Sequence, residues 1–324
     1  MSDTLDKIKA PIKSELEHFE GHFREAMRSQ VPLMDRITYY IVKRRGKQVR
    51  PMFVFLAAAV CGGTTENSYV SASLIELVHT ASLVHDDVVD EAYERRGFFS
   101  INALWKNKIA VLVGDYFLSK GLQIALKHRQ YRALEIMSNA VQQLAEGELL
   151  QIEKARRLDI DEAVYYQVIQ KKTASLIAAA CQAGAASATE NEEDLERMLQ
   201  FGEKAGIAFQ IRDDLFDFGT ADVGKPLGID IKEKKMTLPL IHALQQTDRR
   251  TRRRIISTIK KHSDDADRVA EVIRFVREGP GIPYAEAAMF AYRDEAFALL
   301  HQFPPSEARD ALELLINYVV DREH

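Results

Sequence analysis

Two clusters of aspartate with the same spacing lie far apart in the chain. They are Asp86, Asp87 and Asp90, and Asp213, Asp214 and Asp217. Residues four apart are neighbours on one face of a helix, so the outer carboxylates of each cluster repel one another unless a cation lies between them. Mg²⁺ prefers oxygen ligands and is commonly held by one or two carboxylates together with substrate phosphates. The repeated D-D-x-x-D pattern therefore predicts that Mg²⁺ ions clamp a diphosphate, whereas a single copy would be better explained as a solvated acidic helix end.

Basic residues accompany both clusters. The segment at residues 43–50 reads K-R-R-G-K-Q-V-R, Arg95 and Arg96 follow the first cluster, and Lys225 and Lys235 follow the second. Guanidinium and ammonium groups are the usual partners of diphosphate. Each of these residues alone is typical of a solvated surface, but their position beside the acidic clusters favours a diphosphate site.

The segments that must position these residues are expected to be helical. No proline occurs between residues 52 and 225, where the usual frequency of about 5% predicts roughly nine. Long helices exclude proline because it removes a hydrogen bond and clashes with the preceding turn. The sequences D-I-D-E at 159–162 and T-E-N-E at 189–192 are typical capping boxes at helix starts. Because no linker rich in Ser, Gly or Pro divides the chain, we predict one all-α domain over residues 1–324, a bundle of ten or more helices.

Composition excludes several classes of protein. The 44 basic and 48 acidic residues leave a formal charge of −4, which argues against a nucleic-acid-binding protein. Cys61 and Cys181 have no metal-ligand spacing and are typical of a reduced cytosol. The N-terminus has no apolar core typical of a signal peptide, and the longest apolar run, residues 52–61, is about half as long as a membrane span. We therefore expect a cytoplasmic protein without a transmembrane segment.

From about residue 30 onward the chain resembles the trans (class I) isoprenyl diphosphate synthases, the polyprenyl synthetase family. The segments that carry the resemblance are G-K-Q-V-R-P at 46–51, H-T-A-S-L-V-H-D-D-V-V-D at 79–90, R-R-G at 95–97, K-T-A at 172–174, F-Q-I-R-D-D-L-F-D at 209–217, G-K-P-L-G-I-D at 224–230 and K-M-T-L-P at 235–239. The resemblance implies an isoprenoid-synthase fold around a central substrate cavity, a homodimer, and a Mg²⁺-dependent prenyltransferase that holds about three metal ions with its substrates.

Three groups of site residues follow from the resemblance, position by position. Mg²⁺ would be held by Asp86, Asp90, Asp213 and Asp217, with Asp87 and Asp214 supporting them. The diphosphate of isopentenyl diphosphate would be bound by Lys47, Arg50, His79 and Arg96. The allylic diphosphate would be bound by Arg95, Lys172, Thr173, Gln210, Lys225 and Lys235. The chain departs from the family pattern at Arg45 and Gln48, where Gly and Arg are common, and at Lys234, where Gly is common.

The implied reaction is an ionisation followed by condensation and elimination. The allylic diphosphate leaves to give a carbocation in a pocket that excludes water. The double bond of isopentenyl diphosphate then attacks the carbocation, and a proton passes to the released diphosphate. The reaction requires no side-chain nucleophile, and the sequence shows no Ser/His/Asp signature.

Product length is implied by the residues just before the first cluster. In this family, bulky residues four and five positions before that cluster stop the growing chain. Those positions hold Ser82 and Ala81 here, with Val78 and Ile75 further back, and none is aromatic. We predict a long product, about C30 to C40 by resemblance, for quinone side chains; tight helix packing would explain the small residues about equally well.

Other interpretations stay open. The chain could be a short-chain farnesyl or geranylgeranyl diphosphate synthase, a terpene cyclase, or a non-catalytic subunit, although a subunit of that kind would be expected to lack one cluster. The basic run at residues 249–261 is better explained as a solvated face than as a peripheral contact with an anionic membrane that aids product release. Trp105 and residues 111–118 are interpreted as core or dimer interface.

Overall fold

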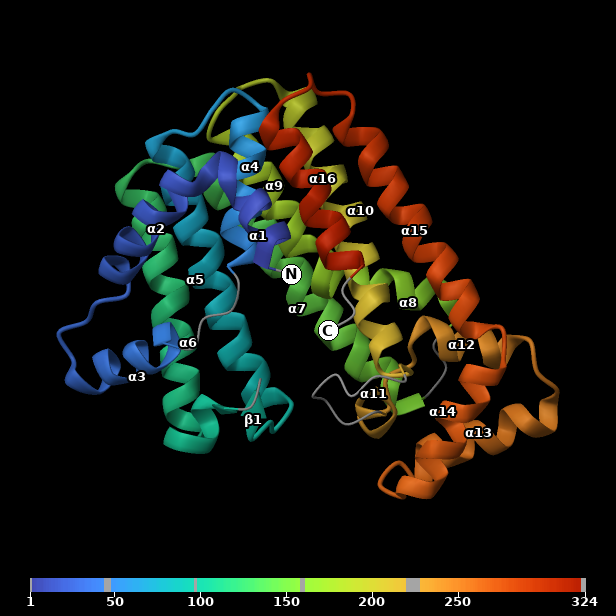
Figure 1. Ribbon diagram of the computed structural model, residues 1–324. Coiled ribbons are helices and arrows are strands. Elements are labelled where there is room, and N and C mark those ends of the chain that lie inside the picture. Colours follow the sequence, from blue (N-terminus) through green and yellow to red (C-terminus); the bar gives the residue numbers. More distant parts are fainter. Residues whose placement is uncertain (1, 44–47, 96–97, 158–160, 220–227, 322–324) are drawn as a thin grey trace. The chain divides into compact units, whose positions relative to one another are not determined.

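The computed structural model describes residues 2–43, 48–95, 98–157, 161–219 and 228–321 (Figure 1). Within these ranges the chain is almost entirely helical. Its only strands there, β1 (Glu94–Arg95) and β2 (Phe98–Phe99), form one short antiparallel pair with Glu94 opposite Phe99. The all-α fold with ten or more helices is therefore confirmed.

The helices of the first half of the chain are α1 (Ser2–Lys9), the 3₁₀ turn η1 (Ala10–Ile12), α2 (Lys13–Ala26), α3 (Pro32–Lys43), α4 (Val49–Val60), α5 (Glu66–Val89), α6 (Ile101–Lys127) and α7 (Tyr131–Arg157). Those of the second half are α8 (Glu162–Ile169), the π turn η2 (Gln170–Ala174), α9 (Ser175–Ala186), α10 (Glu192–Phe216), α11 (Ile229–Lys232), α12 (Leu238–Gln245), α13 (Arg249–Lys261), α14 (Ala266–Glu278), α15 (Gly281–Leu300) and α16 (Glu307–Val320).

These elements form two compact units. Unit 1 consists of Met1–Asn139, Ala179–Leu199 and Phe303–Leu312, and unit 2 consists of Ala140–Ala178, Gln200–Gln302 and Glu313–His324. Helices α7, α9, α10 and α16 each contribute residues to both units. The expectation that residues 1–324 form one domain stays a prediction.

The core of unit 1 is built on α4, α5 and α6. Residues 51–58 of α4 are all buried, because this helix is apolar on every side. Helix α5 packs along α6, and the two lie side by side in Figure 1. The N-terminus of α5 is fixed by a capping box between Thr65 and Ser68, and the Ser68 hydroxyl lies 2.6 Å from that of Ser187. This anchored helix carries the first aspartate cluster at its other end.

In unit 2, α10 lies unusually close to η2 and the start of α9. A Cβ added to Gly202 would lie 2.7 Å from the Cα of Ala178, and one added to Gly206 would lie 2.6 Å from the Cα of Ala174. Only glycine fits where two backbones approach this closely. The approach places Thr173 of η2 within hydrogen-bond distance of Gln210 of α10.

The predicted capping boxes place two helix starts correctly but not the capping residue. Helix α8 is capped by Asp161, whose side chain accepts the Val164 N–H at 2.9 Å, while residue 159 lies outside the described ranges. The assignment of Thr189 as the cap of α10 is wrong: Asn191 Oδ1 accepts the Glu193 N–H at 3.0 Å. In both helices the cap directly precedes the first helical glutamate.

Helix α6 is the one described helix that is long and apolar enough, by length and composition alone, to cross a membrane. Its charged residues interrupt the apolar run, which is why counting uninterrupted apolar residues missed it. The helix packs on α5 at Gly114 and Gly121, where an added Cβ would meet His85 and Leu74, while Leu112 and Leu126 are more than half exposed. A single such helix is weak support for a membrane span, because core helices of soluble proteins meet the same criteria.

Candidate active site

The second aspartate cluster lies at the C-terminal end of α10. Asp213 and Asp214 occupy its last turn, and Asp217 follows directly after the helix. Asp213 is exposed, whereas Asp214 and Asp217 are only 6% and 9% exposed. Negative charges at a helix C-terminus oppose the macrodipole and destabilise the helix. Fold stability therefore does not explain this cluster, whereas a bound cation would.

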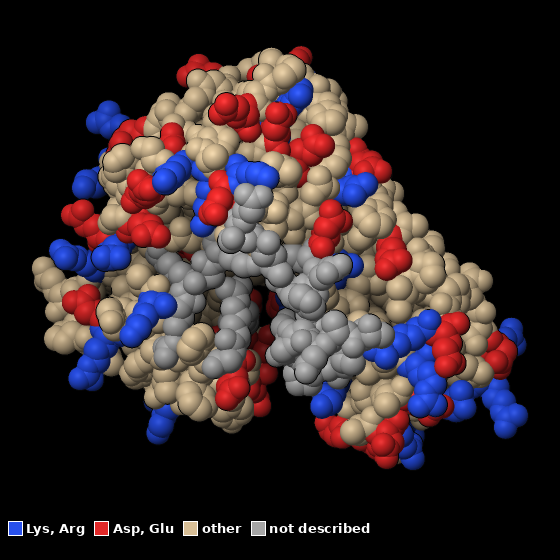
Figure 2. Space-filling model, in the orientation of Figure 1, with Lys and Arg blue, Asp and Glu red and all other residues tan. Residues whose placement is uncertain are grey.

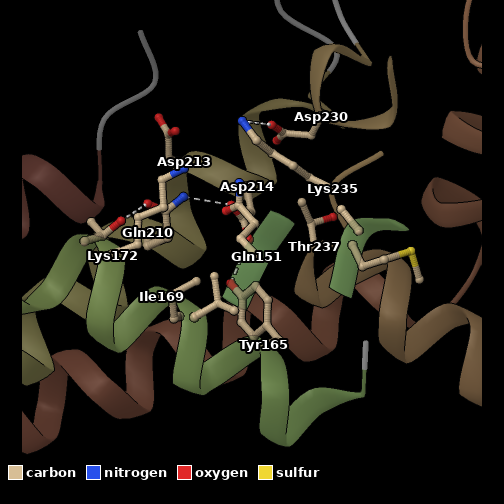
Figure 3. A pocket seen from close by; sticks show the side chains of 14 residues that line it. Gln151, Tyr165, Ile169, Lys172, Gln210, Asp213, Asp214, Asp230, Lys235 and Thr237 are labelled. Carbon is tan, nitrogen blue, oxygen red and sulfur yellow. Dashed lines mark hydrogen bonds and ion pairs between the residues drawn. The ribbon is translucent and has the colours of Figure 1, made fainter. Parts of the chain in front are cut away.

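The cluster borders a cavity of about 190 Å³ within unit 2 (Figure 3). Six residues named from the resemblance line this cavity: Lys172, Thr173, Gln210, Asp213, Asp214 and Lys235. They come from η2, from α10 and from the segment between α11 and α12. The structure thus brings together, around one cavity, carboxylates and ammonium groups from three separate segments.

Asp214 is held by a chain of hydrogen-bonded side chains. The Tyr165 hydroxyl donates to Asp214 Oδ2 at 2.7 Å, and the Gln210 amide donates to Oδ1 at 2.9 Å. Gln210 Oε1 in turn accepts the Thr173 hydroxyl at 2.7 Å. Both carboxylate oxygens of Asp214 are therefore engaged, so Asp214 orients Gln210 and Thr173, and Asp213 is the carboxylate left exposed at the end of α10.

Burial dominates the protonation of these groups. It raises the pKa of Asp214 to about 8, with further contributions from the charges of Asp230 and Asp213. It also raises the pKa of Tyr165 well above its ordinary value. The phenol therefore stays a donor at neutral pH. Tyr165 was missed in the sequence because it lies 49 residues before Asp214 and belongs to no motif.

Asp217 has one oxygen engaged in local structure and one without a partner. Its Oδ1 accepts the N–H of Ile229 at 2.8 Å at the start of α11. Burial raises the pKa of Asp217, and backbone hydrogen bonds from residues 228–230 partly offset that rise. Its Oδ2 is buried and has no hydrogen-bond partner among the described residues. Since buried polar atoms are nearly always satisfied, this oxygen indicates a ligand.

Both lysines of the cavity are paired with carboxylates. Lys172 Nζ lies 2.5 Å from Glu148 Oε2, and Lys235 Nζ lies 3.7 Å from Asp230 Oδ1 while also pairing with Glu233. Burial raises the pKa of Asp230 to about 6, and the charge of Lys235 opposes that rise. These acids hold the two ammonium groups at the cavity wall. Glu148 and Asp230 were not singled out as site residues from the sequence.

Lys172 and Thr173 lie on the π turn η2, between α8 and α9. A π turn inside a helix is rare and frequently occurs at functional sites. Gly147 of α7 lies against this turn, since a Cβ added there would be 2.8 Å from the Lys172 backbone nitrogen. No local sequence signal predicts the π turn, which changes the direction of the Thr173 side chain relative to a regular helix.

The second cluster fits a Mg²⁺ ion that a diphosphate helps to bind. In the part of the chain that the structure describes, no three His, Cys, Asp or Glu side chains are grouped closely enough to hold a metal by themselves. Mg²⁺ usually keeps several waters and binds one or two carboxylates plus substrate phosphates. Exposed Asp213 and the Oδ2 of Asp217, which has no partner among the described residues, are four residues apart and meet that requirement.

The first aspartate cluster lies at the C-terminal end of α5 in unit 1. Asp86 is half-buried, Asp87 is 5% exposed, and Asp90 is exposed. The Asp90 N–H donates to the Asp86 carbonyl at 2.8 Å, and the Asp87 carbonyl accepts the Asn102 amide at 3.0 Å. These bonds fix the end of the helix, so Asp86 and Asp90 remain one turn apart on one face.

Of the residues predicted to bind isopentenyl diphosphate, the structure describes Arg50 and His79. Arg50 Nη1 donates to His79 Nε2 at 2.7 Å, which requires that ring nitrogen to be unprotonated. Lys47, Arg96 and Lys225 lie outside the described residues. Arg95 is placed in strand β1. The binding roles of these residues stay predictions.

The residues predicted to limit product length lie on α5 before Asp86. Ile75, Val78 and Ala81 are at most 3% exposed. Ser82 is half-buried, and its hydroxyl donates to the His79 carbonyl at 3.0 Å. Positions 75, 78 and 82 share the face of Asp86 by helical spacing, whereas position 81 lies on another side. Their effect on product length stays a prediction.

Comparison with known proteins agrees with this geometry. The family model described as Polyprenyl synthetase matches residues 31–276. The chain belongs to the polyprenyl synthetase family. It is accordingly an enzyme of the transferase class, a prenyltransferase.

Two relatives and one solved structure show the extent of the similarity. The chain is 35% identical to heptaprenyl diphosphate synthase component 2 of Geobacillus stearothermophilus, covering 98% of this chain and 100% of that protein. It is 33% identical to the short chain isoprenyl diphosphate synthase of Methanothermobacter thermautotrophicus, covering 95% and 96%. The crystal structure of a decaprenyl diphosphate synthase from Rhodobacter capsulatus superposes with a TM-score of 0.94 at 33% identity, covering 99% of both chains.

Proposed function

We propose that this polyprenyl synthetase is a Mg²⁺-dependent enzyme that joins isopentenyl diphosphate head to tail to an allylic diphosphate. The observation that carries the proposal is the unit 2 cavity, where Asp213 lies with the ammonium groups of Lys172 and Lys235. Carboxylates alone would repel a diphosphate and lysines alone would repel a metal ion. A site that holds both kinds of group fits a diphosphate bound together with Mg²⁺.

Bound Mg²⁺ would supply charge stabilisation to the departing diphosphate. Asp213 and Asp217 would hold one ion, and Asp86 and Asp90 would hold the others of a set of about three. Lys172 and Lys235 would exchange Glu148 and Asp230 for phosphate oxygens. Because these side chains are only 15% to 32% exposed, the exchange would be favourable only if phosphate oxygens and Mg²⁺ compensate for the lost ion pairs.

The other residues of the cavity bind and orient the allylic substrate. Asp214 accepts the Gln210 amide and Gln210 accepts the Thr173 hydroxyl, so we expect both side chains to be held in place before the substrate binds. Val168, Ile169 and Met236 give the cavity an apolar part that would keep water from the carbocation. Arg50 and His79 would bind isopentenyl diphosphate, and the proton lost after condensation would leave with the released diphosphate.

The proposed product is a long polyprenyl diphosphate of about C30 to C40. Support comes from the small side chains at positions 81 and 82 and from the relative named for a heptaprenyl (C35) product, while the name of the decaprenyl (C50) synthase implies a still longer chain for that protein. Because another relative is named as a short chain isoprenyl diphosphate synthase, a farnesyl or geranylgeranyl product is the alternative. A terpene cyclase is the remaining candidate.

The proposed enzyme is a cytoplasmic homodimer. After the kink at Lys106, helix α6 exposes large apolar side chains, among them Leu112, Leu122 and Leu126, that a second copy would bury. One relative is named as component 2 of a heptaprenyl diphosphate synthase. The alternative is therefore that this enzyme needs a second, different chain for activity. Light scattering on the purified chain gives the number of copies, and a monomer that gains activity only with a second protein would contradict the homodimer.

The proposed reaction is tested by product analysis. The purified chain is incubated with Mg²⁺, labelled isopentenyl diphosphate and geranyl, farnesyl or geranylgeranyl diphosphate in turn, and the dephosphorylated products are sized. We expect a ladder of prenyl alcohols that lengthens by five carbons. Cyclic hydrocarbons formed without isopentenyl diphosphate would instead show a cyclase, and absence of product with every primer would contradict the proposal.

A further inference from the structure

Helix α13 carries a dense positive charge that the proposed reaction does not use. Its thirteen residues include seven that are basic and none that is acidic: Arg249, Arg250, Arg252, Arg253, Arg254, Lys260 and Lys261. The chain as a whole has a formal charge of −4, so this helix differs sharply from the rest of the protein. Figure 2 shows basic side chains, with acidic ones among them, where Figure 1 places α13 and α14.

Six of these residues form two parallel rows on the exposed side of the helix. The rows are Arg249, Arg253 and Lys260, and Arg250, Arg254 and Lys261. Both have the spacing i, i+4, i+11, and all six side chains are exposed. Ile255, Thr258 and Ile259 are buried on the opposite side, where α13 packs on α14. At 1.5 Å per residue each row extends over about 17 Å.

The stability of the helix does not explain these rows. Basic residues in the first turn oppose the helix macrodipole, and Asp248 at the N-cap is the acid that counters them by accepting the N–H groups of Arg250 and Thr251. Within the described ranges only Arg254 of the six forms an ion pair, with Glu271 at 3.3 Å. Five cations are therefore available to an anionic partner.

The surroundings of the rows indicate what kind of partner this is. None of the exposed large apolar side chains of the described residues lies between residues 249 and 278. The face therefore lacks the apolar centre typical of a protein interface. The acidic balance of the chain disfavours nucleic acid, which would repel most of the remaining surface. A flat anionic surface touches only one helix face and avoids that repulsion.

We propose that the two rows of α13 dock the enzyme on an anionic membrane surface, in place of the solvated face that the sequence alone favours for residues 249–261. This inference rests on the proposed function, because a long polyprenyl product is insoluble in water and has to enter a bilayer. A basic residue near an anionic leaflet strengthens binding by about fivefold. Loss of one row of three should therefore weaken binding by about 100-fold.

The test measures binding of the full chain to vesicles by sedimentation, without substrates. The vesicles contain phosphatidylcholine alone or with phosphatidylserine, at low and high salt. The row variant replaces Arg249, Arg253 and Lys260 by Gln. The control variant makes the same change in charge at exposed positions of unit 1 away from α6, replacing Lys13, Arg24 and Arg36 by Gln. Far-UV circular dichroism and elongation of a short primer in lipid-free buffer should be unchanged in both variants.

We expect the wild-type chain to bind only the phosphatidylserine vesicles and to dissociate from them at high salt. The row variant should bind these vesicles about 100-fold more weakly than the wild-type chain, and the control variant less than about threefold more weakly. Equal weakening of the two variants, or no binding at low salt, would overturn the proposal. Displacement of the bound enzyme from vesicles by equimolar random-sequence duplex DNA would overturn it in favour of nucleic acid. Since no turnover is measured in the binding assay, failure here is distinct from failure of the proposed reaction.

Discussion

At the scale of single residues, the site depends on how one buried carboxylate is supported. Asp214 lies below the exposed Asp213, and its two oxygens accept hydrogen bonds from Tyr165 and Gln210. A buried carboxyl group without such donors would be costly, because it loses its hydration without compensation. The support is therefore as important to the geometry of the cluster as the aspartates themselves.

Replacement of Tyr165 by Phe tests how much the Tyr165 hydrogen bond to Asp214 contributes to stability and to substrate binding. The variant keeps the ring but leaves Asp214 Oδ2 without its donor, so we expect the free energy of unfolding to fall by about 1 to 3 kcal/mol. We also expect KM for the allylic diphosphate to rise, since Asp214, which accepts the Gln210 amide, loses one of its two donors. Urea unfolding and steady-state kinetics measure both. Tyr166→Phe is the matched control, because the Tyr166 hydroxyl has no hydrogen-bond partner among the described residues; equal effects of the two changes would contradict the role of Tyr165.

The raised pKa of Asp214 predicts how stability depends on pH in the absence of metal. Its pKa is about 8 in the fold, whereas an aspartate in the unfolded chain titrates near 4. Between these values the folded state binds more protons than the unfolded state, so the free energy of unfolding falls as pH rises. Urea unfolding in EDTA from pH 5 to 8.5 measures this slope. Asp214→Asn should flatten it, and an equal slope in the variant would show that other groups cause it.

At the scale of the elements, the position of Thr173 beside Gln210 depends on how closely α10 approaches η2 and α9. Gly202 and Gly206 lie one turn apart on α10, opposite Ala178 and Ala174, which are also four residues apart. Two rows of small residues thus set the distance between the helices. These small residues, which belong to no motif, therefore allow Thr173 and Gln210 to form their hydrogen bond.

Gly206→Ala should disturb this contact. The added Cβ would lie 2.6 Å from the Cα of Ala174, so one backbone must move, and we expect a loss of about 1 to 3 kcal/mol in the free energy of unfolding together with slower turnover. Gly21→Ala on α2 is the control, since nothing lies within 4 Å of its added Cβ and alanine favours a helix. Denaturant unfolding compares them. A Gly206→Ala protein as stable as Gly21→Ala would contradict the close approach.

Helix α5 provides the second test at this scale. A phenylalanine at position 81 or 82 should shorten the product, because it would fill the space just before the first cluster. Ala81 is buried, so Ala81→Phe can also strain the core, whereas half-buried Ser82 shares the face of Asp86 and accepts a larger side chain more easily. Sizing the prenyl alcohols measures the effect. A folded, active Ser82→Phe enzyme with an unchanged product range would contradict the role of this face of α5 in limiting product length.

At the scale of the whole molecule, the sequence predicts the helical class because a long stretch of the chain contains no proline. The aspartate clusters can be found in the sequence because their residues are adjacent or only a few positions apart. Tyr165, Glu148 and Asp230 could not be found in the same way, since each is defined by a contact with a residue distant in the sequence or by burial. The cap of α10 was misplaced by two residues because several polar residues in its short loop can serve equally well. The apolar character of α6 was missed because charged residues divide its apolar residues into short runs.

The most direct test of the proposed chemistry is the initial rate at which the purified chain adds labelled isopentenyl diphosphate to farnesyl diphosphate, with Mg²⁺ and with EDTA. We expect activity only with the metal, and losses of at least about 100-fold in Asp86→Ala and Asp213→Ala at unchanged circular dichroism. Glu193→Ala, an exposed acid at the other end of α10, should keep wild-type activity. A rate unaffected by EDTA, or near-wild-type activity in Asp213→Ala, would contradict the assignment of the aspartate clusters.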